Sequence, residues 1–330
     1  MTEKFNQGYA LLIGVGESAY KPLSLPVTVK DTKAIYAALI DPNLCAYPKE
    51  HIQVLNNAEA TRTKILEGLK WLKEKAQAAP EATVLVYYSG HGWVRDNRYY
   101  LIQHDVKPSK PATSALSAEV FTDSLREIQA ERLLVVIDSC HAAGMATSKN
   151  AAEADEELLD EFEDFQRVAP SKGLISALKQ GKARVVFASS KGEQISRIKD
   201  NSISIYTYHF LEALQGAANQ PGDTEVKVSN VMNHLGKTVP QTAWNLHNAE
   251  QTPRFDFDTD DFAIAKLQGG KGLPEEGWEG IKPQASHKIS QITQTINQRG
   301  KFNLNFGKMS GNFTMGDVID NSDFKEEDEL

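Results

Sequence analysis

Two reactive side chains follow apolar segments that are typical of buried strands. Cys140 ends the segment "VVIDSC", and His91 stands between two glycines in "YYSGHGW". A thiolate is a strong nucleophile, and a nearby imidazole can take the thiol proton or hold the thiolate as an ion pair. Taken singly, the two residues are better interpreted as a buried cysteine and a turn histidine. Their matching positions after two strands favour a catalytic His/Cys pair.

A second histidine, His141, is a rival base because it adjoins Cys140 in the sequence. Side chains of adjacent residues in an extended segment point in opposite directions, so the His141 ring should point away from the thiol. His91 lies 49 residues before Cys140, which leaves room for a strand–helix–strand crossover. We therefore favour His91 as the base.

The segments around these residues alternate between strand-like and helix-like patterns. Alternation of this kind predicts an α/β fold, in which helices cover both faces of a parallel sheet. Functional groups in such sheets gather at the carboxyl ends of the strands. The predicted strands are 9–16, 51–55, 82–89, 132–138 and 183–190, with 251–257 extended, and the predicted helices are 27–40, 61–77, 118–129, 204–216 and 228–239.

Composition excludes several classes of protein. The chain has 330 residues and a formal net charge of −8, which argues against a general nucleic-acid binder. Its two cysteines, Cys45 and Cys140, cannot form a disulfide framework. The first residues contain no basic region, and their apolar run is too short for a signal peptide or a membrane span. We expect a cytoplasmic protein with no membrane or nucleic-acid partner.

The two strand-end segments carry a resemblance to a known family. "YYSGHGW" followed by "VVIDSCHAAG" resembles the active-site motifs of the caspase-like cysteine peptidases, in particular the metacaspase and orthocaspase branch. The resemblance covers roughly residues 8–260 and includes the weaker matches "VVFASSKGEQIS" and "QTPRF". Asp-Ser-Cys-His is the metacaspase form, and the caspase signature around the cysteine is absent. The resemblance implies a caspase-like sandwich with a mostly parallel, six-stranded sheet and helices on both faces.

The resemblance also implies roles for individual residues. His91 and Cys140 match the catalytic pair of the family, and the backbone N–H groups of Gly92 and Cys140 match its oxyanion donors.

An acidic pocket in metacaspases accepts Arg or Lys before the scissile bond, and its residues match Asp31 and Asp138, with Ser89 on its wall. Two carboxylates at one site repel unless a cation lies between them, and a guanidinium satisfies both. The structural alternatives are a surface residue at a helix start for Asp31 and a turn residue for Asp138.

A calcium site is the least secure implication of the resemblance. Asp105 and Asp123 fall near positions of metacaspase calcium ligands, but calcium takes six to eight oxygen ligands. Thr147 or Ser148 stands where the family often has a further Asp. The sequence leaves calcium dependence undecided.

An acidic linker, residues 145–172, separates the nucleophile from the second half of the chain. Such charge runs are usually solvated loops. The linker also contains the basic residues Lys149, Arg167 and Lys172, which flank its acidic run. A peptidase that prefers basic residues could cut its own chain after any of them, so these three are candidate self-cleavage sites.

The chain divides into a peptidase domain and an appended tail. The tail alternates polar and apolar residues with Asn and Gly, which is similar to short homotypic signalling motifs of bacterial immune effectors, although an edge hairpin or a disordered tail fits equally well. The predicted divisions are 1–265 for the peptidase domain, with a large-subunit-like half 1–144 and a small-subunit-like half 173–265, then a linker 266–288 and a β-prone tail 289–330.

These observations favour a cysteine endopeptidase that cleaves protein substrates after Arg or Lys and processes itself in the acidic linker. The alternative from another class is a non-catalytic caspase-fold adaptor that acts through its tail. An intact His/Cys pair argues against the adaptor. A third alternative is a clostripain-like or separase-like peptidase of the same fold.

Overall fold

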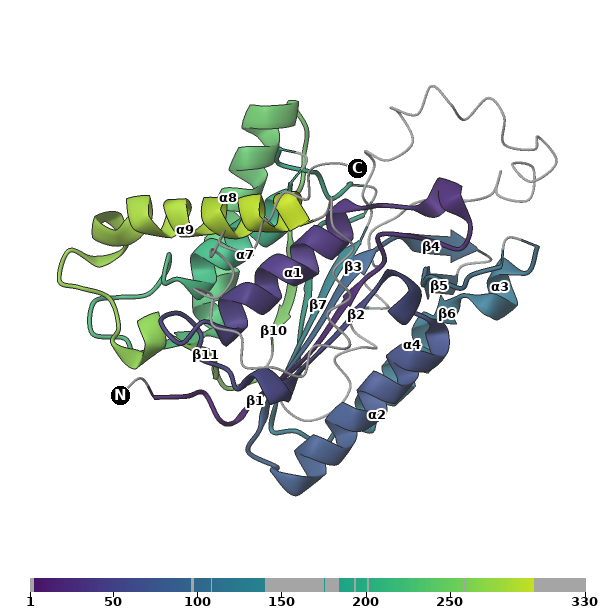
Figure 1. The fold of residues 1–330 in the computed structure, drawn as a ribbon, viewed down its shortest axis with the longest axis horizontal. Helices are drawn as coiled ribbons and strands as arrows, with labels where there is room; N and C mark the ends of the chain where they lie inside the picture. The colour runs from purple at the N-terminus through teal and green to yellow at the C-terminus, as the bar shows by residue number, and fades with distance from the viewer. Residues whose placement is uncertain are drawn as a thin grey trace, which may run out of the picture.

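A six-stranded sheet forms the centre of the protein, as the computed structural model shows (Figure 1). The structure describes residues 3–95, 98–107, 109–139, 175, 184–192, 194–200, 202–257 and 259–299. Cys140, the acidic linker with its three candidate cleavage sites, and residues 300–330 therefore lie outside the described part of the chain.

The strands of the central sheet run in the order β10-β8-β7-β3-β1-β2. All neighbours are parallel except β10, which runs antiparallel to β8. This arrangement confirms the predicted fold class. The strands are β1 (Gly8–Gly14), β2 (Ile52–Asn56), β3 (Thr83–Gly90), β7 (Arg132–Ser139), β8 (Arg184–Ala188) and β10 (Arg254–Phe257).

Both faces of the sheet are buried because successive side chains point to opposite faces. In β1, Leu12 packs into one hydrophobic core, while Leu11 and Ile13 pack into another. The first core lies beneath helices α1 (Val27–Ile40), α7 (Ile205–Leu214), α8 (Val228–His247) and α9 (Gly277–Arg299), and the second beneath α2 (Arg62–Ala78) and α4 (Ala118–Arg126). Figure 1 shows the two helical layers on either side of the strands.

Two small sheets add to this frame, and the sequence reasoning missed both because their strands are only two to four residues long. One follows β3 directly and consists of β4 (Gly92–Arg95), β5 (Arg98–Leu101) and β6 (Leu116–Ser117), and the other pairs β9 (Glu225–Lys227) with β11 (Ala263–Lys266). The remaining short elements are α3 (Pro111–Ser114), η1 (Lys21–Leu23), η2 (Lys49–His51), η3 (Asn57–Glu59) and η5 (Gln268–Gly270).

The expected linker 266–288 and the start of the β-prone tail at residue 289 are wrong as local structure. Residues 277–299 form the long helix α9, and β11 extends to Lys266. Ile289 and Ile292 are buried, and Ile296 packs against the same core. Their spacings of three and four residues place them on one helical face, so tertiary packing rather than strand-like alternation decides this segment.

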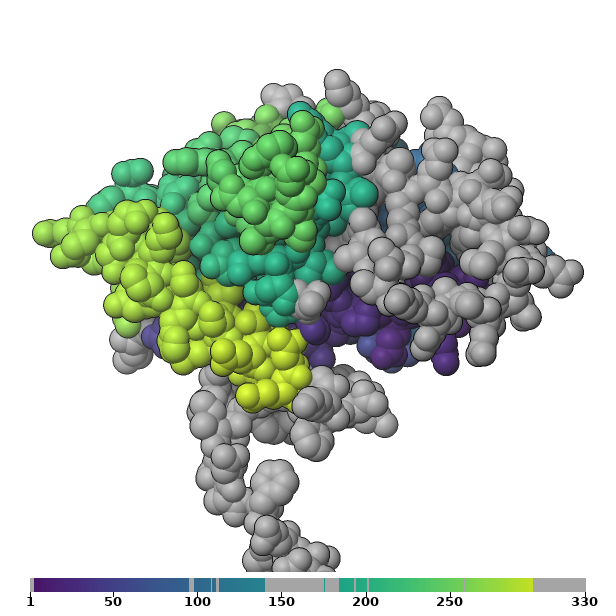
Figure 2. All heavy atoms as spheres, turned by 90° about the horizontal axis from the view of Figure 1, so that it is seen from above, coloured from purple at the N-terminus to yellow at the C-terminus, as the bar shows by residue number. Residues whose placement is uncertain are grey.

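Helix α9 packs against α1 and α7 in the same layer as α8. Figure 2 shows the green and yellow segments that contain α8 and α9 lying together on this side of the molecule. Among the helices that the structure describes, none is long and apolar enough to cross a membrane.

Candidate active site

The carboxyl ends of β3 and β7 meet at one edge of the central sheet. The two strands are parallel neighbours, with Ser89 opposite Asp138 and Gly90 opposite Ser139. His91 directly follows β3, and Cys140 is the next residue in the sequence after β7. The predicted meeting of the two motif-bearing strands is confirmed, although Cys140 itself lies beyond the described residues.

Two hydrogen bonds to its carbonyl oxygen, one from a side chain and one from the backbone, hold the main chain of His91 in place. The Tyr88 hydroxyl donates to this oxygen over 2.9 Å, and the backbone N–H of Ile102 donates over 3.0 Å. His91 is buried, with 3% of its surface exposed. These two contacts fix the backbone from which the imidazole of His91 projects.

Gly92 allows a close approach that a larger residue would prevent. It begins β4 opposite Leu101, and a Cβ atom at this position would overlap the hydroxyl of Tyr99. That hydroxyl lies 2.8 Å from the hydroxyl oxygen of Ser139, the last residue of β7. The missing side chain at residue 92 therefore lets Tyr99 connect the β4–β5 hairpin to the end of β7.

The structure brings Asp31, Asp138 and Ser89 together, as the resemblance implied. Asp31 and Asp138, here called the buried acidic pair, are both fully buried. Ser204 joins them: its backbone N–H donates to Asp31 Oδ1 over 2.8 Å, and its hydroxyl donates to Asp138 Oδ2 over 2.8 Å. Ser89 Oγ donates to Asp31 Oδ2 over 3.1 Å. The alternatives of a surface Asp31 and a turn Asp138 are thereby wrong.

Further donors to the pair were missed by sequence reasoning. Ser196 Oγ donates to Asp138 Oδ1 over 2.7 Å, and the Tyr87 hydroxyl donates to Asp138 Oδ2 over 3.3 Å. Ser204 also accepts a hydrogen bond from the backbone N–H of Thr207, so it is the N-cap of α7. A serine before an apolar helical segment is a readable cap signal, whereas nothing in the local sequence marks Ser196.

Burial and like charge dominate the electrostatics of the acidic pair. Burial raises the pKa of Asp31 well above its ordinary value of 3.8, and the nearby carboxylate of Asp138 raises it further. Hydrogen bonds from Ser204, Ser89 and Thr207 oppose this rise only in part. A cation placed against the pair would offset the repulsion, because it is attracted to both carboxylates.

Asp105 and Asp123, the two aspartates near the calcium-ligand positions of metacaspases, make other contacts. Asp105 is exposed and accepts a hydrogen bond from the backbone N–H of Arg62, the first residue of α2, over 2.9 Å. Asp123 pairs with Arg126, one helical turn away on α4, over 2.7 Å. Within the described residues, one group of three or more potential metal donors occurs, and it contains neither aspartate. These contacts leave calcium dependence undecided.

Comparison with known proteins agrees with this geometry. The sequence profile of the caspase domain matches residues 7–262. The chain belongs to the caspase domain family. The family supports a cysteine peptidase that acts on protein substrates.

Three solved structures are similar to this chain at low sequence identity. A protein from Geobacter sulfurreducens is 18% identical with a TM-score of 0.50, and the match covers 81% of this chain and 99% of that one. The Drosophila initiator caspase Dronc is 11% identical with a TM-score of 0.50, covering 83% of this chain and 87% of its own. Caspase-1 from Spodoptera frugiperda is 12% identical with a TM-score of 0.48, covering 82% and 93%. No curated protein matches significantly.

Because the pKa of Asp31 is raised, an Asp31→Asn variant should be more stable than the wild type at neutral pH. The folded protein holds this proton more tightly than the unfolded chain, so stability falls as pH rises from about 4 towards the raised pKa. The neutral amide removes this loss. We expect the variant to melt above the wild type at pH 7, by about 2–4 °C for each 1 kcal/mol of relieved repulsion, and to match it more closely at pH 4.

Thermal melting of both proteins from pH 4 to pH 8 measures this effect. Asp41→Asn is the control. Asp41 caps the C-terminal end of the same helix and forms an ion pair with Lys288 over 2.8 Å. Because the substitution removes this ion pair, the variant protein should not be more stable than the wild type. A wild-type protein that is more stable than Asp31→Asn at pH 7 would contradict the electrostatic interpretation.

Gly92→Ala is expected to displace Tyr99 and break its contact with Ser139. The overlap should lower the free energy of unfolding by about 1–3 kcal/mol, as in other overpacked sites. Urea denaturation measures this loss. Gly236→Ala on α8 is the matched control, because its new Cβ atom would lie 3.5 Å from Phe255, an ordinary contact. If both variants are equally stable, residue 92 has no steric role.

Proposed function

We propose that the protein is a metacaspase-like endopeptidase that cleaves after Arg or Lys through His91 and Cys140. The observation that carries this proposal is the buried acidic pair of Asp31 and Asp138, which lies at the strand edge from which both motif residues continue. A nucleophile with its base supplies the chemistry, and the pair supplies the charge preference.

In the proposed reaction, His91 takes the proton of the Cys140 thiol and the thiolate attacks the carbonyl carbon of the scissile bond. The backbone N–H groups of Gly92 and Cys140 stabilise the negative oxygen that forms. The imidazolium then gives its proton to the leaving amine, which leaves a thioester on Cys140. A water molecule, deprotonated by His91, hydrolyses the thioester and restores the thiol.

The acidic pair supports selection of a basic side chain. A guanidinium carries five N–H donors in a fixed fork, so it can pair with two carboxylates at once. The hydroxyls of Ser89, Ser196 and Ser204 donate to the carboxylates in this structure. Since hydroxyl groups rotate, the three serines can turn their O–H groups away, and the carboxylate oxygens can then accept hydrogen bonds from an incoming cation. An aspartate side chain at the same place would meet two like charges.

Self-processing is the second part of the proposal. The acidic linker that follows Cys140 in the sequence contains Lys149, Arg167 and Lys172. A pocket for basic residues would accept any of these three side chains. The linker would then restrain the enzyme until it is cut. The supporting observations are the charge of the acidic pair and the position of the linker in the sequence.

Fluorogenic peptides that differ only in the residue before the cleaved bond test the specificity. Peptides ending in Arg or Lys should exceed the Asp peptide by at least about 100-fold in kcat/KM, because a buried like-charge contact costs several kcal/mol. Asp138→Asn should raise KM for the Arg peptide. Assays with and without calcium decide the calcium question.

Cys140→Ala and His91→Ala are the controls and should each lower kcat by orders of magnitude without loss of fold. An Asp-selective profile would refute the pocket assignment. Complete inactivity of a folded wild type towards every peptide, with or without calcium, would favour the non-catalytic adaptor.

Incubation of the wild-type protein should yield two fragments that stay associated, with cuts after Lys149, Arg167 or Lys172. The Cys140→Ala protein should remain whole under the same conditions. Mass spectrometry of the fragments identifies the sites, and replacement of all three residues by Gln should prevent cleavage. A fully active enzyme that remains a single chain would show that self-processing is not its switch.

A further inference from the structure

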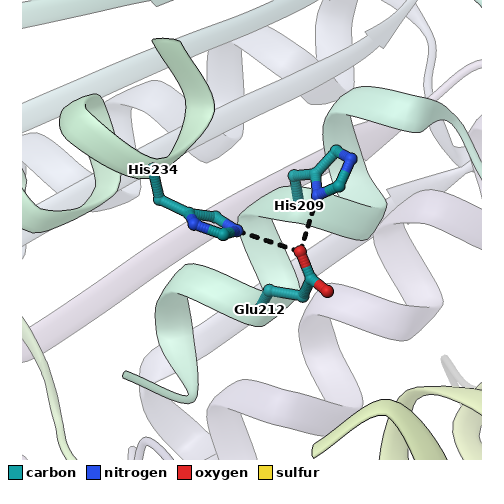
Figure 3. A group of neighbouring side chains, drawn as sticks. All are labelled: His209, Glu212 and His234. Atoms are coloured by element: carbon teal, nitrogen blue, oxygen red, sulfur yellow. Dashed lines mark hydrogen bonds and ion pairs between the residues drawn. The ribbon is translucent and has the colours of Figure 1, made fainter. Parts of the chain in front are cut away.

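A second cluster of polar side chains lies in the helical layer, on α7 and α8. His209 Nδ1 lies 2.6 Å from Glu212 Oε2, and His234 Nε2 lies 2.9 Å from the same oxygen. Figure 3 shows both rings directed at this one carboxylate oxygen. One potential ligand atom from each residue lies within 4.8 Å of the other two. This group, here called the His–Glu–His cluster, plays no part in the proposed reaction.

The cluster holds a negative charge inside the protein. The three side chains are only 8–9% exposed. Burial alone would raise the pKa of Glu212, but hydrogen bonds from His209 and His234 outweigh it and lower the pKa to about 2. Burial lowers the pKa of the His209 imidazole, and the neighbouring Glu212 carboxylate opposes this shift only in part. Lys199 adds a nearby positive charge, which also lowers the pKa of His209. Its ammonium group lies 4.5 Å from the ring centre of Tyr208, the residue before His209.

We propose that His209, Glu212 and His234 form a binding site for a divalent metal ion of the zinc class. Two imidazole nitrogens and one carboxylate are ligands that zinc prefers, and three protein ligands plus one water is a common zinc arrangement. Tetrahedral ligands at about 2.0–2.1 Å from the ion lie about 3.3 Å apart. To reach this spacing, the Glu212 oxygen would have to move about 0.7 Å further from His209 Nδ1 and about 0.4 Å further from His234 Nε2.

A second contact of His209 supports this assignment. Its Nε2 lies 2.7 Å from the hydroxyl oxygen of Thr242 on α8. A metal-binding histidine usually donates its other ring N–H to an oxygen acceptor, which leaves the lone pair of the first nitrogen available to the ion. Thr242 is placed to be that acceptor. The ring of Trp278, from α9, packs edge-on against the ring of His234, with 6.4 Å between the ring centres.

The metal would fasten α7 to α8 through bonds that neither helix makes alone. Helix α7 begins after Ser204, which joins the two carboxylates of the acidic pair. An ion at Glu212 would therefore stabilise the helix whose first turn contacts the proposed substrate site. The competing interpretation is a metal-free triad in which both imidazoles donate N–H groups to Glu212 and Thr242 donates to His209.

Metal binding is measured on the tag-free Cys140→Ala chain, because the thiol of Cys140 could itself bind zinc. After removal of metal with a chelator, calorimetric titration with Zn²⁺ should show one equivalent bound and a higher melting temperature. Mg²⁺, which prefers oxygen ligands, should not compete. Co²⁺ should bind at the same site with a tetrahedral absorption spectrum.

Substitutions then locate the ion. Glu212→Gln and His234→Gln should each abolish stoichiometric binding, and Thr242→Val should weaken it by about 10–100-fold. His247→Gln is the matched control: this residue is on the same helix, its ring nitrogen contacts the carbonyl of Ile198, and its loss should leave the affinity unchanged.

No stoichiometric binding of Zn²⁺ or Co²⁺ would overturn the site and leave the metal-free triad. Binding that survives both ligand substitutions would overturn it equally, since the ion would then lie elsewhere. If a ligand variant does not fold, the affinity of the folded Thr242→Val protein decides the question. None of these measurements uses peptidase activity, so the result is independent of the proposed function.

Discussion

The hydrogen bonds of Ser204 to two buried carboxylates are the interaction on which the candidate site depends. Asp31 comes from α1 and Asp138 from β7, and each would repel the other in a buried environment without donors between them. Ser204 supplies a backbone N–H to one and a hydroxyl to the other. The first turn of α7 is thus held against both elements. Burying two like charges costs stability, and the donors around the pair offset part of that cost.

The pleat of the central sheet distributes the remaining groups. Asp138 and Tyr87 lie on the face of the sheet that α1 and α7 cover. On this face the Tyr87 hydroxyl donates a hydrogen bond to Asp138, and the Ser89 hydroxyl donates one to Asp31. Ser139, the next residue, contacts Tyr99 on the opposite side, where the β4–β5 hairpin begins. One parallel register therefore places the acidic pair and the hairpin contact on opposite faces of the same strand end. His91 and Gly92 follow from the neighbouring strand.

Helix α7 links the acidic pair to the helical layer outside the sheet. Its first turn contacts Asp138 through Ser204, and its later turns carry His209 and Glu212 against α8. Helix α9 closes this layer through Trp278 and its buried isoleucines. A change that loosens α7 from α8, such as the loss of the His–Glu–His cluster, would therefore act on the helix that holds the acidic pair. The two groups are chemically separate but structurally joined.

The sequence alone determined the parts of this protein that have a local signature. Alternating apolar patterns predicted the sheet and most helices, and the residues after "VYYSG" and "VVIDS" predicted which strand ends carry reactive groups. The resemblance to metacaspases pointed to Asp31, which no local pattern marks. The spacing of Ile289, Ile292 and Ile296 was readable as a helix, but the Asn- and Gly-rich segment beyond it favoured an extended interpretation. Tertiary structure decided the donors around the acidic pair and the His–Glu–His cluster. The Ser204–Asp31 hydrogen bond joins residues 173 apart in the chain, and His234 reaches Glu212 across 22 residues. Such contacts arise from the packing of helices on a sheet, and no periodicity within one segment encodes them.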